Sequence, residues 1–595
     1  MDFYGFYTGK VFDAYEFLGC HKAGQGYVFR VFAPGADRMA LAGDFNGWQD
    51  AEMNRIYDGN FWEAYVDQAR EGMNYKYRIY SADGQCTEHC DPYGYGMELR
   101  PKNASVIRNI HSYEFRDGAW MRNRSDCKDK PLNIYEIHAG SWKMHPSKEN
   151  GWHNYRELAD MLIPYMKEMG YNYVELMPVS EHPCDNSWGY QNTGFFSPTS
   201  RYGTAEDLKA FVDKCHQNQI GVILDFVPVH FAVDGYALAN FDGTPLYEYP
   251  YSDLEESQWG SKNFNFNRGE VRSFLQSAAN YWLKEYHFDG LRVDALSNLV
   301  YWQGDSGRGE NVNAVAFIKL LNAEMKKRYP GILLAAEDST TYPNVTKPVA
   351  EGGLGFDYKW DMGWMNDTLA YFKEQPQDRV RDYHKLTFSM MYFYSERFML
   401  PFSHDEVVHG KAAIVQKMYG LYDDKFAQAK ALYLYMYVHP GKKLNFMGNE
   451  FAQFREWDES REQDWGILSY PSHFGFHKYM KKLHHIYLEN PALSAWDYQH
   501  RGFQWLDCHQ EAKCIYAIKR MGKGQTMLAL FNFSDKRQPY EVKLEHCSKL
   551  TLLLDTDAKE YGGQSEESPN YIWNLKHGKT TIQLPAYSGM LYIVE

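Results

Sequence analysis

The stretch HFDGLRVDALSNL, residues 287–299, decides the fold because it places three charged residues in a segment that is otherwise apolar and strand-forming. These residues are Asp289, Arg292 and Asp294. Side chains two residues apart on a strand point to the same side, so Arg292 and Asp294 share one face. The segment predicts a buried strand with charged side chains gathered near its end.

Seven other segments of the same strand-like character surround this one, and amphipathic helical segments separate them. The predicted strands lie in NIYEIHAGSW, YNYVELMPV, GVILDFVPV, GILLAAED, FDYKWDMGW, RFMLPFSHDE and KLNFMGNEF. The segment TAEDLKAFVDKCHQ shows a helix most clearly, because Thr204 can cap it and an apolar stripe follows. Eight strand-then-helix units predict an α/β fold with a (β/α)8 barrel. The alternative, an open doubly wound sheet, lacks its Gly-rich phosphate loop after the first strand.

The regions on either side of the barrel have a different pattern, in which predicted strands follow one another without long helices between them. This pattern predicts three domains. Residues 26–80 contain short alternating strands broken by turns, typical of a β-sandwich. Strands return after the helix-like segment PSHFGFHKYMKKLHHIYLEN. We therefore expect an N-terminal β-sandwich within residues 1–120, the (β/α)8 barrel within 121–494 and a C-terminal all-β domain within 495–595.

Composition and charge exclude several classes of protein. The net charge of −14 disfavours a nucleic-acid partner, and no basic run offsets it. The segment ALYLYMYV at 431–438 is far shorter than the roughly 20 residues that span a bilayer, and the N-terminus resembles no export signal. Nine scattered cysteines fit reduced thiols in a cytoplasm, although a zinc site at Cys86, His89 and Cys90 is an alternative. An aromatic fraction of 17% favours a carbohydrate ligand.

Polar residues recur where the predicted strands end. In a barrel of this kind, the carboxyl ends of the strands form the active-site face. The candidates are Asp225, His230, Arg292, Asp294, Glu337, His404 and Asp405. Two alternatives remain open for these charges, a structural ion-pair network and a metal site. A pair of carboxyl groups is the arrangement that cleaves a glycosidic bond. Arg292 would keep Asp294 ionised as the nucleophile, and Glu337 would then act as acid and base.

Four ordered motifs, DFVPVH, GLRVDA, AAEDST and PFSHDEVVH, resemble the conserved regions of the α-amylase superfamily, glycoside hydrolase family 13. The resemblance implies that Asp294 is the nucleophile, Glu337 the general acid and base, and Asp405 the aspartate that stabilises the transition state. It also implies that the glucose undergoing reaction is bound by Arg292, His404, Asp225 and His230, and that it stacks on Tyr190.

Within that superfamily, three longer blocks resemble the glycogen (1,4-α-glucan) branching enzymes. These blocks are MPVSEHPCDNSWGYQNTGFFSPTSRYGT, PFSHDEVVHGK and FMGNEFAQFREWD. The segment GDFNGWQ, residues 43–49, is similar to the starch-binding-like module that precedes the barrel in such enzymes. Trp48 would then either contact glucan or pack against the barrel. The resemblance implies a retaining transfer of an α-1,4-linked chain to a 6-hydroxyl, with no metal and no organic cofactor.

Residue types alone leave the acceptor open, because water and a sugar hydroxyl can both complete the second step. The alternatives are therefore a 4-α-glucanotransferase or an α-glucan hydrolase on the same scaffold, and a non-catalytic glucan-binding protein. Trp259, Trp302 and Trp360 would either line glucan grooves or serve as packing. We expect an α-glucan as partner, no membrane, and a monomer or weak oligomer. The sequence does not predict the length of the transferred chain or the preferred glucan.

Overall fold

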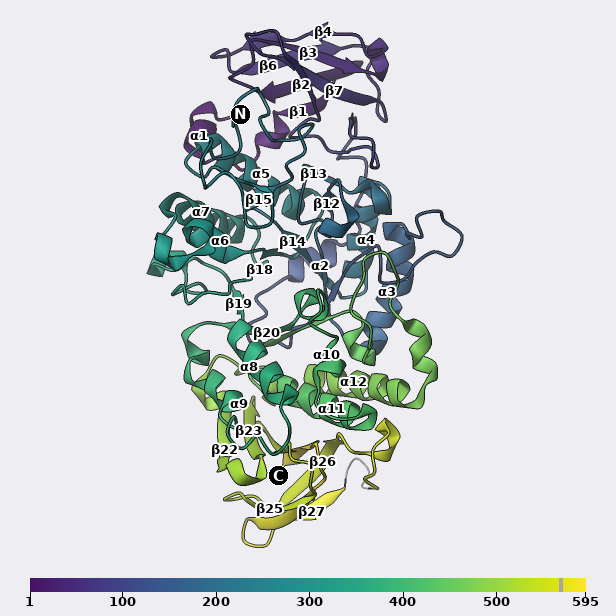
Figure 1. Cartoon of the computed structure of the whole chain (residues 1–595), viewed down its shortest axis with the longest axis vertical. Coiled ribbons are helices and arrows are strands. Elements are labelled where there is room, and N and C mark those ends of the chain that lie inside the picture. The colour runs from purple at the N-terminus through teal and green to yellow at the C-terminus, as the bar shows by residue number, and fades with distance from the viewer. Residues whose placement is uncertain (567–570) are drawn as a thin grey trace. The chain divides into compact units, whose positions relative to one another are not determined.

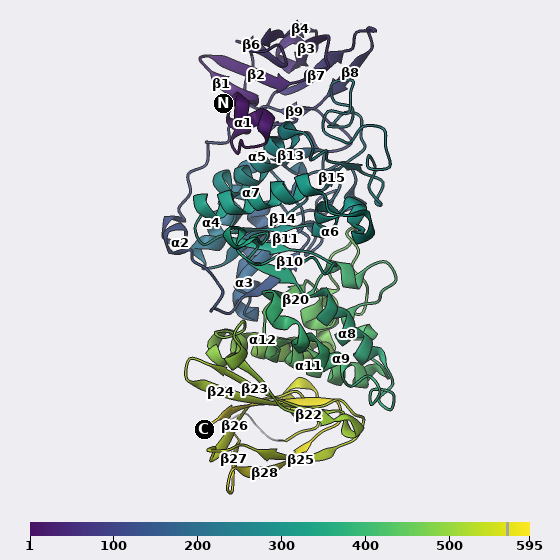
Figure 2. The ribbon, with the colours of Figure 1, turned by 90° about the vertical axis from the view of Figure 1, so that its left-hand side faces the viewer.

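The computed structural model describes residues 1–566 and 571–595 and forms two compact units (Figures 1 and 2). The first unit contains residues 1–125, 138–161 and 175–356, and the second contains 126–137, 162–174 and 357–595. The predicted domain limits at 120 and 494 stay predictions. In the described part of the chain, no helix combines the length and apolarity required to cross a membrane.

The first unit begins with the predicted N-terminal β-sandwich, drawn in purple in Figure 1. One sheet has the order β1-β2-β6-β5 and the other contains β4-β3-β7-β8, with β9 paired to β7. Strand β7 (Asn74–Tyr80) alternates buried and half-buried residues, as a strand with one core-facing side should. Phe29 of β2 (Gly26–Phe32) meets Tyr75 of β7 edge-on, with ring centroids 4.9 Å apart, so aromatic rings fill the space between the sheets. The other strands are β1 (Gly19–Ala23), β3 (Arg38–Gly43), β4 (Ala51–Glu52), β5 (Asn54–Ile56), β6 (Phe61–Val66), β8 (Cys86–His89) and β9 (Ser105–Val106).

Eight parallel strands close into a barrel in the order in which they occur in the chain. The predicted eight strands and the barrel are confirmed, and the open doubly wound sheet is excluded. Every barrel strand is buried along its length, which explains the near-continuous apolar runs in the sequence. The strands are β10 (Asn133–Ile137), β11 (Tyr173–Leu176), β14 (Gly221–Phe226), β17 (Gly290–Val293), β18 (Leu333–Ala336), β19 (Tyr358–Trp360), β20 (Phe398–Phe402) and β21 (Lys442–Phe446).

Amphipathic helices follow the strands, as the periodicity predicts. Helix α4 (Ala205–Gln217) begins with a capping box, in which the Thr204 hydroxyl accepts a hydrogen bond from the Asp207 amide. Helix α5 (Gly269–Glu285) lies beside α1 (Phe3–Thr8) in both views (Figures 1 and 2), and the Ser273 hydroxyl donates to the Phe6 carbonyl at 2.9 Å. The longer helices of the barrel region also include α3 (Tyr155–Met169), α7 (Val312–Arg328), α8 (Met362–Lys373), α11 (Tyr422–Val438) and α12 (Pro471–Glu489).

Asp289, the first charge of the segment 287–299, is structural. It precedes β17 and is fully buried, and one of its oxygens lies 2.8 Å from Nε2 of His216. The same oxygen accepts the Val222 amide at 2.8 Å, and the other accepts Nε1–H of Trp120 at 2.8 Å. Its charge is therefore paired and hydrogen-bonded, as a buried carboxylate requires.

The second unit ends in the predicted all-β domain, drawn in yellow in Figure 1. Its six-stranded sheet has the order β22-β23-β24-β29-β26-β27, and β25 pairs with β28. An apolar core that includes Leu528, Leu552 and Ile582 lies between them. Residues 567–570 of this predicted domain lie outside the described residues. The strands are β22 (Phe503–Gln510), β23 (Ile515–Gly522), β24 (Gln525–Asn532), β25 (Gln538–Lys543), β26 (Lys549–Asp555), β27 (Ile572–Asn574), β28 (Lys579–Leu584) and β29 (Ser588–Val594).

Candidate active site

Arg292 lies at the centre of the charged cluster in the first unit. Asp225 on β14 is its register partner across the sheet, and Nη1 of Arg292 lies 2.7 and 2.8 Å from the two oxygens of Asp225. The same Nη1 lies 2.7 Å from Oδ1 of Asp294, and Nη2 lies 3.8 Å from Oε2 of Glu337. Burial acts to lower the pKa of Arg292, but Asp225 and the other nearby groups raise it well above its usual value. The guanidinium is therefore a fixed positive charge among three carboxylates.

Glu337 is held by the turn that follows β17. The amide of Ala295 donates a 2.7 Å hydrogen bond to Oε2 of Glu337. Ala295 has φ 48° and ψ 48°, a left-handed conformation that is uncommon for a residue with a Cβ. This conformation turns the chain from β17 into α6 (Leu296–Val300), whose first amide donates to the Glu337 carbonyl at 2.9 Å. Asp294 and Glu337 directly follow the paired strands β17 and β18, and the strained turn after Asp294 holds the Glu337 side chain.

Tyr190 and His230 lie in the loops of the same unit. The Tyr190 hydroxyl donates to Oδ2 of Asp225 at 2.5 Å, and the Arg292 guanidinium lies 5.9 Å from the centre of its ring. His230 is buried, which lowers its pKa to about 4, so the imidazole is neutral near pH 7. Its Nδ1 has no hydrogen-bond partner in the described part of the chain, and its ring lies 5.2 Å from that of Trp259. A neutral imidazole with an unused nitrogen can bind a hydroxyl group.

His404 and Asp405 lie in the second unit, just after β20. Nδ1 of His404 lies 2.5 Å from Oε1 of Glu136, and the His404 amide donates to Oε2 of the same residue at 3.0 Å. Nε2 of His404 lies 3.5 Å from Oδ1 of Asp405, whose side chain is 45% exposed. Glu136, on β10, is fully buried. The contacts fix the orientation of His404 and leave Asp405 open to solvent.

Glu136 was missed by reasoning from the sequence. The signal was present, because a single glutamate interrupts the apolar run NIYEI. An isolated buried carboxylate requires a partner, but the run does not say which residue provides it.

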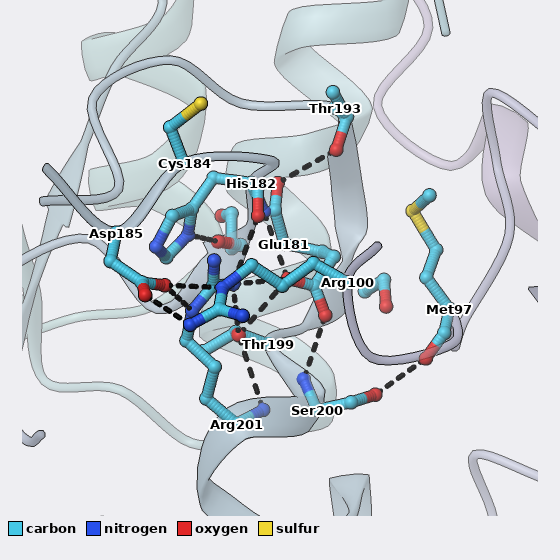
Figure 3. A network of polar contacts seen from close by, with 12 residues as sticks. Met97, Arg100, Glu181, His182, Cys184, Asp185, Thr193, Thr199, Ser200 and Arg201 are labelled. Carbon is cyan, nitrogen blue, oxygen red and sulfur yellow. Dashed lines mark hydrogen bonds and ion pairs between the residues drawn. The ribbon is translucent and has the colours of Figure 1, made fainter. Parts of the chain in front are cut away.

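A second ion-pair network fixes the loop that carries Tyr190 (Figure 3). Arg201 is fully buried, and its Nη1 lies 2.7 Å from Glu181 of β12 (Ser180–Glu181). Its Nε lies 2.8 Å from Oδ1 of Asp185, to which Nε of Arg100 also donates at 2.7 Å. Figure 3 shows both arginines at the carboxylate of Asp185. The sequence did not single out these residues, although Glu181, Asp185 and Arg201 lie in the block around Tyr190.

The remaining candidates have other surroundings. Nε1 of Trp48 donates to Asp44 at 3.0 Å, and its carbonyl accepts from Arg78, so these hydrogen bonds lie within the N-terminal sandwich. Trp259 is 44% exposed, Trp302 is half-buried, and Trp360 is buried and therefore part of the packing.

The proposed zinc alternative finds no support in the geometry. Both ring nitrogens of His89 are engaged, with the Ala237 carbonyl at 2.8 Å and the Thr87 hydroxyl at 3.0 Å. Cys86 is exposed and Cys90 is buried. Within residues 1–566 and 571–595, no group of three or more His, Cys, Asp or Glu side chains is arranged to hold a metal ion.

Three protein families match segments of the chain. Residues 17–94 match carbohydrate-binding module 48 (isoamylase N-terminal domain), and residues 145–243 match the alpha amylase catalytic domain. Residues 505–595 match the alpha amylase C-terminal all-beta domain.

Full-length relatives are also similar. The chain is 43% identical to the 1,4-alpha-glucan branching enzyme GlgB of Fusobacterium nucleatum, with 99% of this chain and 98% of the relative covered. It is also 43% identical to GlgB of Bacillus subtilis strain 168, with 95% and 92% covered.

Solved structures share the fold at lower identity. A putative alpha amylase from Salmonella typhimurium has a TM-score of 0.72 at 18% identity, with 97% of this chain and all of that chain covered. A pullulanase from Anoxybacillus sp. LM18-11 has a TM-score of 0.76 at 16% identity, with 97% and 87% covered.

Proposed function

Because this chain belongs to the family of the 1,4-α-glucan branching enzymes, we propose that it cleaves an α-1,4 bond in a linear glucan and rejoins the cut chain through an α-1,6 bond. The observation that carries the residue assignments is the position of Arg292 between Asp225 and Asp294, beside Glu337. A permanent cation at this place favours the ionised form of Asp294. An ionised carboxylate is the nucleophile that a retaining mechanism requires.

The proposed reaction has two displacement steps. In the first, Asp294 attacks the anomeric carbon while Glu337 gives its proton to the leaving glycosidic oxygen, which releases one part of the glucan. In the second, Glu337 removes the proton from the 6-hydroxyl of an acceptor chain. That oxygen attacks the anomeric carbon and releases Asp294 as a carboxylate. The two carboxyl groups provide the nucleophile, the acid and the base for both steps. The proposal therefore includes no metal and no organic cofactor.

The other site residues bind the reacting sugar in this proposal. Asp405 stabilises the transition state, with His404 beside it, and Asp225 and His230 bind hydroxyl groups. The Tyr190 ring is a stacking surface for an apolar sugar face. We include Trp48 as a glucan contact of the N-terminal sandwich. In this proposal the sandwich binds the polymer separately from the catalytic residues.

A test on amylose distinguishes the acceptors. Total reducing ends are followed during incubation, and the ends released by a debranching enzyme are counted afterwards. Constant total ends with rising debranchable ends support branching. Rising total ends without debranchable ends mean that water is the acceptor and that the protein is a hydrolase. Redistributed chain lengths alone mean a 4-α-glucanotransferase, and no change at all means a glucan-binding protein.

The cellular setting is part of the same proposal. The net charge of −14 disfavours nucleic acid as a partner. We propose that the protein works in the cytoplasm on an α-glucan, as a monomer or weak oligomer. Free cysteines throughout the described chain are compatible with a reducing compartment.

A further inference from the structure

A cavity of about 500 Å³ opens in the second unit, and none of the residues assigned to catalysis lines it. Its walls are the N-terminal half of α11 and the first turn of α12, together with loops of the C-terminal β-domain. Lys430 and Tyr561 belong to these walls, and the Lys430 ammonium donates to the Tyr561 carbonyl at 2.9 Å. The volume lies within the range of roughly 300–1,000 Å³ that is typical of small-ligand sites.

Polar side chains in the walls have unused hydrogen-bonding groups. In the described part of the chain, the side chains of Ser472, Arg537 and Gln564 form no hydrogen bond or ion pair with the protein. Lys430 is buried, and its one described hydrogen bond uses one of three N–H donors. A hydroxyl, a guanidinium, an amide and an ammonium are therefore available to a ligand that offers many acceptors and donors.

Aromatic rings connect the cavity wall to the surface. Phe426 lines the cavity, and its ring lies 4.9 Å from that of Tyr422, which is 45% exposed. Phe426 also meets His473 at 4.9 Å, and His473 lies 6.4 Å from Tyr470, which is 60% exposed. Exposed rings next to polar groups suit sugars, because a sugar has apolar faces and hydroxyl edges.

The charge of the walls selects among ligand classes. Three carboxylates, Asp423, Asp424 and Asp557, face two cations, Lys430 and Arg537. A phosphorylated ligand would meet repulsion, and a cationic ligand would meet Lys430 and Arg537. A neutral polyhydroxyl compound can donate to the carboxylates and accept from the cations without a net charge of its own.

We propose that this cavity and the rings of Tyr422 and Tyr470 form a second α-glucan-binding site, which holds a segment of the polymer away from the catalytic residues. The inference rests on the proposed function, since that function supplies the ligand class. The site would raise the affinity for long glucans by adding a second attachment to the same molecule.

The test uses the full-length protein with Glu337→Gln, so that the glucan is not consumed. Tyr470→Ala and Arg537→Ala are introduced separately, and retardation in native gels containing amylopectin gives the dissociation constants. We expect each change to raise the dissociation constant by about 3- to 10-fold, the size of effect expected when one ring contact or charged hydrogen bond is lost. The matched control is Phe388→Ala, because Phe388 is a 55% exposed aromatic residue of the same unit outside the cavity.

The outcomes separate this inference from the proposed function. If the unmodified enzyme makes branches but both variants are retarded like the Phe388→Ala control, the second site is wrong and the function stands. If the unmodified enzyme makes no branches, the proposed function is wrong, whatever the gels show. Arg537-dependent binding of inorganic phosphate, with unchanged retardation by amylopectin, would also overturn the inference.

Discussion

The backbone amide of Ala295 donates a 2.7 Å hydrogen bond to the carboxylate of Glu337, 42 residues further along the chain. Ala295 directly follows Asp294, so the residue next to the proposed nucleophile holds the proposed acid. The left-handed backbone of Ala295 makes this contact possible. One strained residue therefore couples the positions of two carboxyl groups that we propose act on opposite sides of one bond.

Asp294→Ala and Glu337→Gln should each reduce kcat by at least about 10²-fold, the lower end of what an acid or base group contributes. Each variant removes a group that, in the proposed mechanism, acts on the reacting atoms. Branch formation on amylose measures the effect, and the melting temperature serves as the control for folding. Rates near that of the unmodified enzyme in either variant would contradict the assignments.

Glu136→Gln should disturb His404, because an amide NH₂ would replace one of the two oxygens that accept from this residue. A buried donor left without an acceptor costs about 1–3 kcal/mol, so the free energy of unfolding should fall by that amount. We also expect a lower kcat with a smaller change in KM, because His404 loses its fixed orientation. A variant with unchanged melting temperature and unchanged kcat would show that Glu136 does not position His404.

Arg201→Met should destabilise the protein far more than Arg156→Met. The Arg201 side chain is buried and pairs with Glu181 and Asp185, and its loss should cost about 3–5 kcal/mol, because the buried carboxylate of Glu181 loses its partner. Arg156 pairs with Asp207 at 2.6 Å but is 50% exposed, and such pairs contribute about 0–1 kcal/mol. Calorimetric unfolding of the two variants provides the comparison. Equal losses would mean that the network in Figure 3 adds no stability to the Tyr190 loop.

Stability should depend on His216 at alkaline pH. Burial acts to lower the pKa of His216, but Asp289 and Asp117 raise it from 6.5 to about 9. Since the folded-state pKa is raised, the contribution is complete below about pH 6.5 and is lost as pH rises through about 9; its size is on the order of 3 kcal/mol. The pKa values of Asp117 and Asp289 are lowered, so their contributions are lost only in acid.

The measurement is the melting temperature of the unmodified protein and of His216→Gln from pH 6 to 10. The difference between them should be largest near pH 6 and shrink toward pH 10. His111→Gln, at an exposed position, is the control. A difference that stays constant with pH would show that His216 is not charged in the folded protein.

Much of the fold was predictable because each barrel strand is a short apolar run with a polar residue at its end. Asp225, Arg292, Asp294 and Glu337 were predicted together for this reason, and the structure places them within one cluster of ion pairs. An apolar run that ends in a polar residue predicts a polar strand end. It does not predict which charged residues pair with one another.

The missed features depend on contacts between residues distant in the chain. Glu136 and His404 are 268 residues apart, and nothing local to either residue names the other. The left-handed backbone of Ala295 could not be predicted either, because glycine, and not alanine, is the residue that indicates this conformation in a sequence. Asp289 shares the segment of Arg292, but the sequence assigned it no role, and its contact with His216 could not be read from the segment.

Strand β10 pairs with β21, with Asn133 opposite Lys443. During synthesis, one edge of β10 must therefore wait until about 300 further residues have been made, which takes about 15–60 s at ribosomal rates of roughly 5–20 residues per second. An unpaired parallel edge is prone to join another chain. The closure that leaves the finished barrel without edges thus leaves β10 open to aggregation while the chain is still on the ribosome. Chaperones that bind nascent chains should therefore raise the yield of soluble protein in a heterologous host.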